Sequence, residues 1–189
     1  MIRLHTVGFG LAAATGLSLA AAGCSTTTNG PMATQPGVAA GTAATARLMT
    51  ADGADVGTAT ATALSGGGVR VAVNAHDLPP GAHGAHIHAV GRCDAPDFTS
   101  AGGHWNPTGS QHGVQNPAGP HAGDMPNLLI GTNGEGSLAV NLPAGTYNGL
   151  MDADGAAMVI HSGPDDMRTD PSGNSGSRIA CGVFMPEGM

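Results

Sequence analysis

Turn signals divide this chain, from about residue 43 onward, into short segments. Gly and Pro supply 32 and 13 of its 189 residues, and many of them stand at segment ends beside Asn or Asp. Between the turns, Val69, Val71 and Val73 alternate with Arg, Ala and Asn, a pattern typical of a half-buried strand. Similar runs lie at 44–50, 56–64, 83–90, 127–131, 136–142, 156–161 and 179–184. Because no stretch of this part has a useful helical period, eight short strands with Gly-rich turns predict an all-β sandwich or barrel.

The composition limits what the domain binds and how its core is built. Apolar residues make up 41% of the chain, which is enough to exclude wholesale disorder. Only five residues are aromatic, so we expect a core of Val, Leu, Ile, Ala and Met. There is no lysine, and six Arg stand against thirteen acidic residues. Nucleic acid is therefore excluded as a partner, because phosphate binding requires clustered positive charge.

The N-terminus has the features of an export signal. A positive start, Met1–Arg3, precedes the apolar stretch 7–22, which is short for a membrane span. Small residues lead to Cys24, and this resembles the bacterial lipoprotein box in which the Cys is acylated, although Ala21 stands where Leu is preferred. The alternative is ordinary signal cleavage nearby, which leaves a soluble protein with a spare thiol.

These features predict three parts: a signal peptide at 1–23, an acylated Cys24 with a flexible tether at 24–42, and one domain at 43–189. The uncharged tether would span about 20–25 Å as a random coil. The domain would be exported to the periplasm or cell envelope and held at a membrane only by its lipid, at the outer membrane in a Gram-negative cell.

Residues 91–126 contain no convincing strand or helix. A structureless segment of that length in a compact domain needs something else to order it. It contains Cys93, His104, His112, His121 and Asp124. A disulfide and a metal ion would supply the missing order.

The histidines can form metal sites. His86 and His88 are two apart in an expected strand, so their side chains lie on one face with backbones about 6.6–6.8 Å apart. His104, His112, His121 and Asp124 are a set suited to tetrahedral Zn²⁺. His161 ends another apolar strand. Seven candidates make two sites of four ligands only if one residue serves both.

Five segments of the chain, in the order in which they occur, resemble the copper/zinc superoxide dismutases in their bacterial exported form. They are His83–His88, Ser100–Pro107, His121–Asp124, Val159–His161 and Gly173–Gly182. The resemblance implies an eight-stranded Greek-key β-barrel with long metal-binding and active-site loops. It also implies one copper and one zinc per subunit.

The resemblance assigns ligands residue by residue. His104 would bridge the two ions as an imidazolate. The other copper ligands would be His86, His88 and His161, and the other zinc ligands would be His112, His121 and Asp124.

The resemblance also implies roles around the metals. Asp165 would link a copper-ligand His to a zinc-ligand His, the alternative being a solvated acidic turn at Asp165–Asp166. Arg178 would dock the anionic substrate beside copper, the alternative being an ordinary surface charge. Cys93 would pair with Cys181 in an oxidising compartment.

The implied activity is the disproportionation of superoxide to O2 and H2O2, with His104 delivering a proton. The alternative is a periplasmic copper- and zinc-binding lipoprotein without significant turnover. The segment between His161 and Arg178 lacks the lysines that attract substrate in many relatives, which predicts a rate below the diffusional ceiling. His83 and His76 are expected to be structural and superficial, respectively. Any low-charge strand face could form a homodimer interface.

Overall fold

The computed structural model describes residues 39–188. The predicted signal peptide, Cys24 and most of the tether lie outside this range. The strands are β1 (Ala43–Met49), β2 (Asp55–Ala63), β3 (Val69–Ala75), β4 (Gly81–His83), β5 (Ala85–His88), β6 (Leu128–Ile130), β7 (Gly136–Leu142), β8 (Ala157–His161), β9 (Arg178–Val183) and β10 (Met185–Pro186). Two short helices, η1 (Thr99–Ala101) and α1 (Tyr147–Leu150), interrupt the loops.

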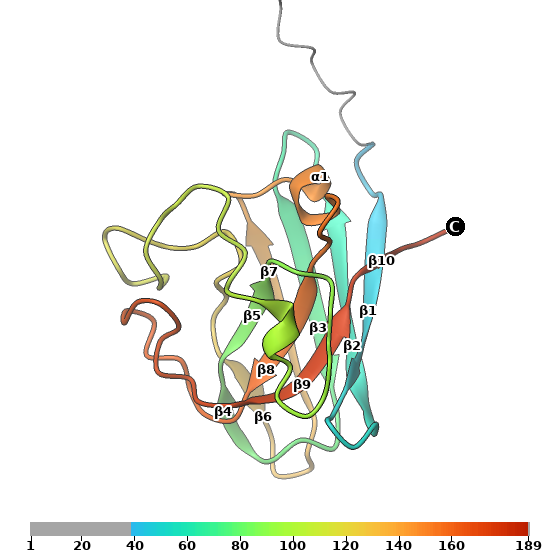
Figure 1. Ribbon diagram of the computed structural model, residues 1–189, viewed down its shortest axis with the longest axis vertical. Coiled ribbons are helices and arrows are strands. Elements are labelled where there is room, and N and C mark those ends of the chain that lie inside the picture. The colour runs from blue at the N-terminus through green and yellow to red at the C-terminus, as the bar shows by residue number, and fades with distance from the viewer. Residues whose placement is uncertain (1–38, 189) are drawn as a thin grey trace, which may run out of the picture. The chain divides into compact units, whose positions relative to one another are not determined.

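The strands form one large antiparallel sheet and one small one. The large sheet has eight strands in the order β5-β8-β9-β1-β2-β3-β7, with β10 paired to β1. The small sheet pairs β4 with β6. Figure 1 shows the large sheet curled, with long loops projecting beside β5 and β8. The all-β prediction is confirmed.

The predicted strand at 83–90 is divided in two at Gly84. The residues before it pair with β6, whereas those after it pair with β8. A Cβ on Gly84 would lie only 2.7 Å from Ser175 Cβ, so a glycine is needed where the loop after β8 comes close. The division places His86 and His88 on β5, a strand of the large sheet, beside β8, which ends at His161.

The core is mainly aliphatic, and the aromatic residues of the described range are buried with it. Val69, Val71 and Val73 are buried while Arg70 is exposed, as the alternation predicts. The aromatic residues were not expected to contribute, yet Phe98, Trp105, Tyr147 and Phe184, all those in the described range, are buried. Each aromatic ring buries a large apolar area, so even a few of them contribute substantially to the core.

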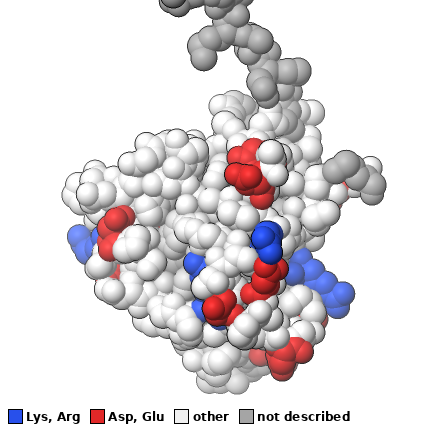
Figure 2. Space-filling view, viewed as in Figure 1, with Lys and Arg blue, Asp and Glu red and all other residues white. Residues whose placement is uncertain are grey.

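The segment 91–126 is largely irregular, as predicted, with η1 as its only helix. The Cys93–Cys181 disulfide fastens it to β9 across a sequence separation of 88 residues, which confirms the expected pairing. Among residues 39–188, no helix is long and apolar enough to cross a membrane. Figure 2 shows scattered charges on a mostly uncharged face.

Candidate metal centre

The irregular segment is bound to β5 by backbone contacts at both ends of its histidine-rich part. His88 pairs with His104, and His86 pairs with Asp124, in isolated antiparallel bridges. Between them, the Ile87 carbonyl accepts from Trp105 N–H and the Ile87 N–H donates to the Gly123 carbonyl, at 2.8 and 3.0 Å. The loop residues thus lie beside the strand histidines although they are far away in sequence.

Four histidines converge on one buried point. His86, His88, His104 and His161 each offer one ring nitrogen, and these four atoms lie within 4.8 Å of one another. Each atom (Nδ1 of His86, Nε2 of the other three) is buried without a hydrogen-bond partner. Buried polar atoms are nearly always paired, so four unpaired nitrogens at one point fit a metal ion.

The opposite nitrogens of these rings are fixed by hydrogen bonds. His88 Nδ1 lies 2.8 Å from the Gly102 carbonyl, and His161 Nδ1 lies 3.1 Å from the Gly176 carbonyl. Such a bond holds the proton on that nitrogen, so that the lone pair of the other nitrogen points inward.

The second group surrounds one carboxylate oxygen. Asp124 Oδ1 lies 2.8 Å from His104 Nδ1, 3.1 Å from His112 Nδ1 and 3.3 Å from His121 Nδ1. Ligand atoms about 2.0–2.1 Å from a tetrahedral Zn²⁺ are roughly 3.3 Å apart, so the spacing suits zinc. His104 belongs to both groups through its two nitrogens, as the count of seven candidates requires.

Burial favours the neutral form of three rings in the first group. It lowers the pKa of His88 to about 2, of His161 to about 3 and of His104 to about 4, even though a hydrogen bond to Gly102, Gly176 or Asp124 opposes the shift in each ring. Neutral imidazoles have a free lone pair, which ligation requires.

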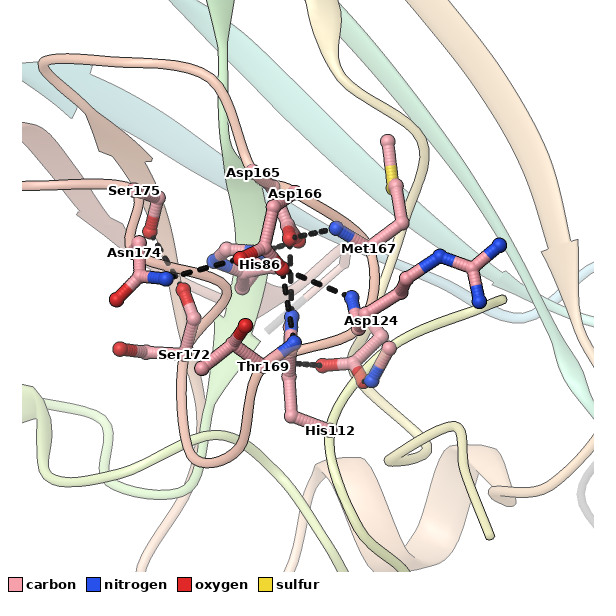
Figure 3. A network of polar contacts seen from close by, with 12 residues as sticks. His86, His112, Asp124, Asp165, Asp166, Met167, Thr169, Ser172, Asn174 and Ser175 are labelled. Carbon is pink, nitrogen blue, oxygen red and sulfur yellow. Dashed lines mark hydrogen bonds and ion pairs between the residues drawn. The ribbon is translucent and has the colours of Figure 1, made fainter. Parts of the chain in front are cut away.

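Asp165 joins the two groups from outside (Figure 3). Its Oδ2 lies 2.7 Å from His86 Nε2 and its Oδ1 lies 3.0 Å from His112 Nε2. Without metal, burial would lower the pKa of His112, but hydrogen bonds to Asp124 and Asp165 outweigh burial and raise that pKa to about 9. Asp165 is only 4% exposed, so the solvated-turn alternative is wrong for this residue.

Arg178 lies at the edge of the four-histidine group. Its Nη1 donates to the Phe98 carbonyl at 2.6 Å and its Nη2 donates to the Gly102 carbonyl at 2.7 Å. Because Gly102 also binds His88 Nδ1, a single carbonyl connects the guanidinium to a candidate ligand. The surface-charge alternative does not describe this half-buried, doubly bonded side chain.

Sequence reasoning assigned no role at the site to three residues near the histidines. Asn127 clamps the backbone of Asp165, accepting from its N–H at 2.8 Å and donating to its carbonyl at 2.9 Å. Asp170 Oδ1 accepts from His112 N–H at 2.6 Å and lies 3.7 Å from His121 Nε2. Gly173 approaches so closely that a Cβ there would overlap Asp165 Oδ1. The signal for Asp170 was present in the sequence, because it is one of three Asp residues between His161 and Arg178, a segment characterised above by its lack of lysines.

The two remaining described histidines stand outside both groups. His83 is buried, with its ring nitrogens 2.8 Å from the carbonyls of His161 and Pro79, as expected of a structural residue. His76 is partly exposed and contacts Asp55 and Asp77.

Fold and geometry together define a class: an all-β metalloprotein with two adjoining ligand groups that share one histidine. The family model of copper/zinc superoxide dismutase matches residues 56–184. The chain therefore belongs to the copper/zinc superoxide dismutase family, which consists of oxidoreductases that use copper and zinc.

Individual relatives agree with this assignment. The chain is 52% identical to copper/zinc superoxide dismutase 1 of Aquifex aeolicus over 124 residues, covering 61% of this chain and 72% of that protein. It is 39% identical to the Caulobacter vibrioides copper/zinc superoxide dismutase over 148 residues, covering 75% and 84%. The crystal structure of a superoxide dismutase-like protein from Bacillus subtilis matches with a TM-score of 0.68 at 38% identity, covering 75% of this chain and 97% of that one.

Proposed function

We propose that this protein is a superoxide dismutase in which His86, His88, His104 and His161 hold copper while His104, His112, His121 and Asp124 hold zinc. The reaction converts two superoxide anions and two protons into one O2 and one H2O2. The observation that carries the proposal is the meeting of four unpaired buried nitrogens at one point, with the opposite nitrogen of His104 in a second ligand set.

Bound copper would supply the redox chemistry, alternating between Cu²⁺ and Cu⁺ as it takes an electron from one superoxide and gives it to another. His104 is the residue placed to move a proton. Its Nε2 faces the four-histidine group and its Nδ1 lies against Asp124. Protonation of Nε2, followed by donation to the reduced anion, delivers the proton where it is consumed.

The zinc set has a positioning task. His112, His121 and Asp124 all belong to the irregular segment, so a shared ion would hold that segment and the bridging ring in place. Asp165 acts through His86 and His112, accepting from both rings and fixing their orientation.

Arg178 is proposed to dock superoxide. A guanidinium stays protonated at any accessible pH and offers a rigid fork of donors to a small anion. A metal carrier has no need of such a group, which disfavours the carrier alternative.

A substitution series at Arg178 tests this role. Arg178→Ala should reduce superoxide decay substantially and leave metal content unchanged, because Arg is not a ligand. Arg178→Lys should be intermediate, and Arg178→Glu should be worse than Ala because a like charge then faces the anion. Stopped-flow measurement at low and moderate salt gives the order. Three variants as fast as the parent would refute the docking role.

We further propose that the chain is exported, cleaved before Cys24 and lipid-anchored in the cell envelope, with residues 43–189 as its enzymatic domain. The small residues before Cys24 support this, and so does a disulfide, which persists in oxidising compartments. Metabolic labelling with palmitate should mark the parent and not Cys24→Ser. Equal labelling of both would refute acylation of Cys24.

The proposal includes a homodimer. Only 10% of the residues are charged, so strand faces with little charge are available, and the buried centres of protein interfaces are depleted of charged residues. Sedimentation equilibrium of the domain should give twice the monomer mass, and a monomer at all concentrations would refute the dimer.

A further inference from the structure

One turn of helix, η1, holds the Arg178 guanidinium from two sides. The turn is flanked by Phe98 and Gly102, which both have positive φ angles, of 55° and 74°. The carbonyls of these two flanking residues accept from Nη1 and Nη2 of Arg178. The position of the guanidinium therefore depends on the conformation of a single short turn.

Phe98 adopts a backbone conformation that suits it poorly. A φ of 55° with ψ of 21° is left-handed, which is uncommon for a residue with a bulky side chain. Such a conformation persists only where the surroundings impose it, and it is often found at functional sites.

The aromatic ring provides the constraint. Phe98 is 2% exposed and packs in a small cluster separate from the main core, together with Ala101, Ala157, Val159 and Cys181, with Cys93 against it. Its N–H also donates to the Asp94 carbonyl at 3.0 Å. A ring fixed between the disulfide and β8 leaves its own backbone little freedom to relax.

We propose that Phe98 is a positioning residue for Arg178: burial of its ring maintains the left-handed backbone that directs its carbonyl at Nη1. The inference rests on the proposed docking role of Arg178. The same turn also affects the placement of Arg178 relative to His88, because the Gly102 carbonyl at its other end binds both side chains. A relaxed turn would move the guanidinium relative to the candidate copper ligands.

Anion binding separates positioning from ordinary core packing. Azide is a small anion whose binding to the copper- and zinc-loaded protein can be titrated by visible absorption, with no turnover involved. Arg178→Ala sets the effect of losing the guanidinium. Phe98→Ala should weaken azide about tenfold, the effect of losing about 1.4 kcal/mol. Phe98→Leu keeps part of the apolar anchor and should fall between Phe98→Ala and the parent.

Phe184 provides a matched control. It is also 2% exposed, but it belongs to the main core cluster. Phe184→Leu should lower the melting temperature at least as much as Phe98→Leu while azide affinity stays at the parental value.

The outcomes distinguish this inference from the function on which it rests. If Arg178→Ala weakens azide while both Phe98 variants bind it like the parent, the positioning role is refuted and the docking role stands. If Phe184→Leu weakens azide as much as Phe98→Leu, the effect is general destabilisation and the inference is again refuted. If Arg178→Ala itself binds azide like the parent, the docking role fails, and positioning for docking fails with it.

Discussion

Replacing Asp165 by Asn should weaken zinc binding about 10–100-fold. The carboxylate accepts from His86 Nε2 and His112 Nε2 at 2.7 and 3.0 Å, using one oxygen for each ring. An amide offers only one acceptor oxygen, so one buried imidazole N–H would face an NH2 group. Loss of a hydrogen bond to a charged group costs about 1.5–3 kcal/mol, and about 1.4 kcal/mol corresponds to tenfold in affinity. The result agrees with the usual effect of removing a group that orients a metal ligand.

Competition with a chromogenic chelator measures the zinc affinity of parent and variant directly. Asp166→Asn is the matched control, because the neighbouring carboxylate contacts only its own loop, accepting from the N–H groups of Arg168 and Thr169 and from Asn174 (Figure 3). The control should stay within about twofold of the parent. If Asp165→Asn also retains its zinc affinity within that range, the carboxylate does not orient the ligands and the reasoning is wrong.

Three further predictions concern the bridge, the pH response and the loop. His104→Ala should abolish dismutation while copper, quantified by metal analysis, remains bound through three histidines; parental activity in a fully metallated variant would contradict the bridge. In metal-free protein, the pKa of His112 is raised, so this residue stabilises the fold fully below pH 6.5 and the stabilisation is lost as pH rises through about 9. The pKa values of His88 and His161 are lowered, so these two residues destabilise the fold as pH falls below 6.5. Urea unfolding should therefore give a stability maximum near pH 6.5, and a flat profile between pH 5 and 9 would contradict this. Hydrogen exchange within 91–126 should slow when zinc binds, and equal protection with and without zinc would show that zinc does not order the segment.

The strands were predictable because burial imposes a period on the sequence. Val69, Val71 and Val73 lie in the core because one face of β3 is covered, and the same alternation reveals most other strands. The need for glycine at the break was not predictable, because the residue that comes close to Gly84 is Ser175, from a loop about ninety positions away. Likewise, no local pattern indicates that the rings of Phe98 and Trp105 become buried where loops meet the sheet.

The candidate ligands were identifiable by residue type and number, since seven of them make two sets of four only if one residue is shared. That His104 is the shared residue, and which ligand belongs to which set, was implied by the family resemblance. The groups that surround the candidate ligands were harder to predict from the sequence. Asn127 contributes through backbone contacts to Asp165, and Asn side chains at turns are too common to be singled out. The carbonyls that hold Arg178 leave no trace in the sequence, because every residue has a carbonyl and only the fold directs it.

The most direct test of the central claim is the rate of superoxide decay at defined copper occupancy. Pulse radiolysis of the purified domain, fully loaded with zinc and loaded with copper in steps, should give a second-order rate that rises in proportion to copper bound. The rate should fall to background when copper is withheld and zinc retained. A fully copper- and zinc-loaded protein that leaves superoxide decaying at the spontaneous rate would contradict the assignment of this site as a dismutase centre.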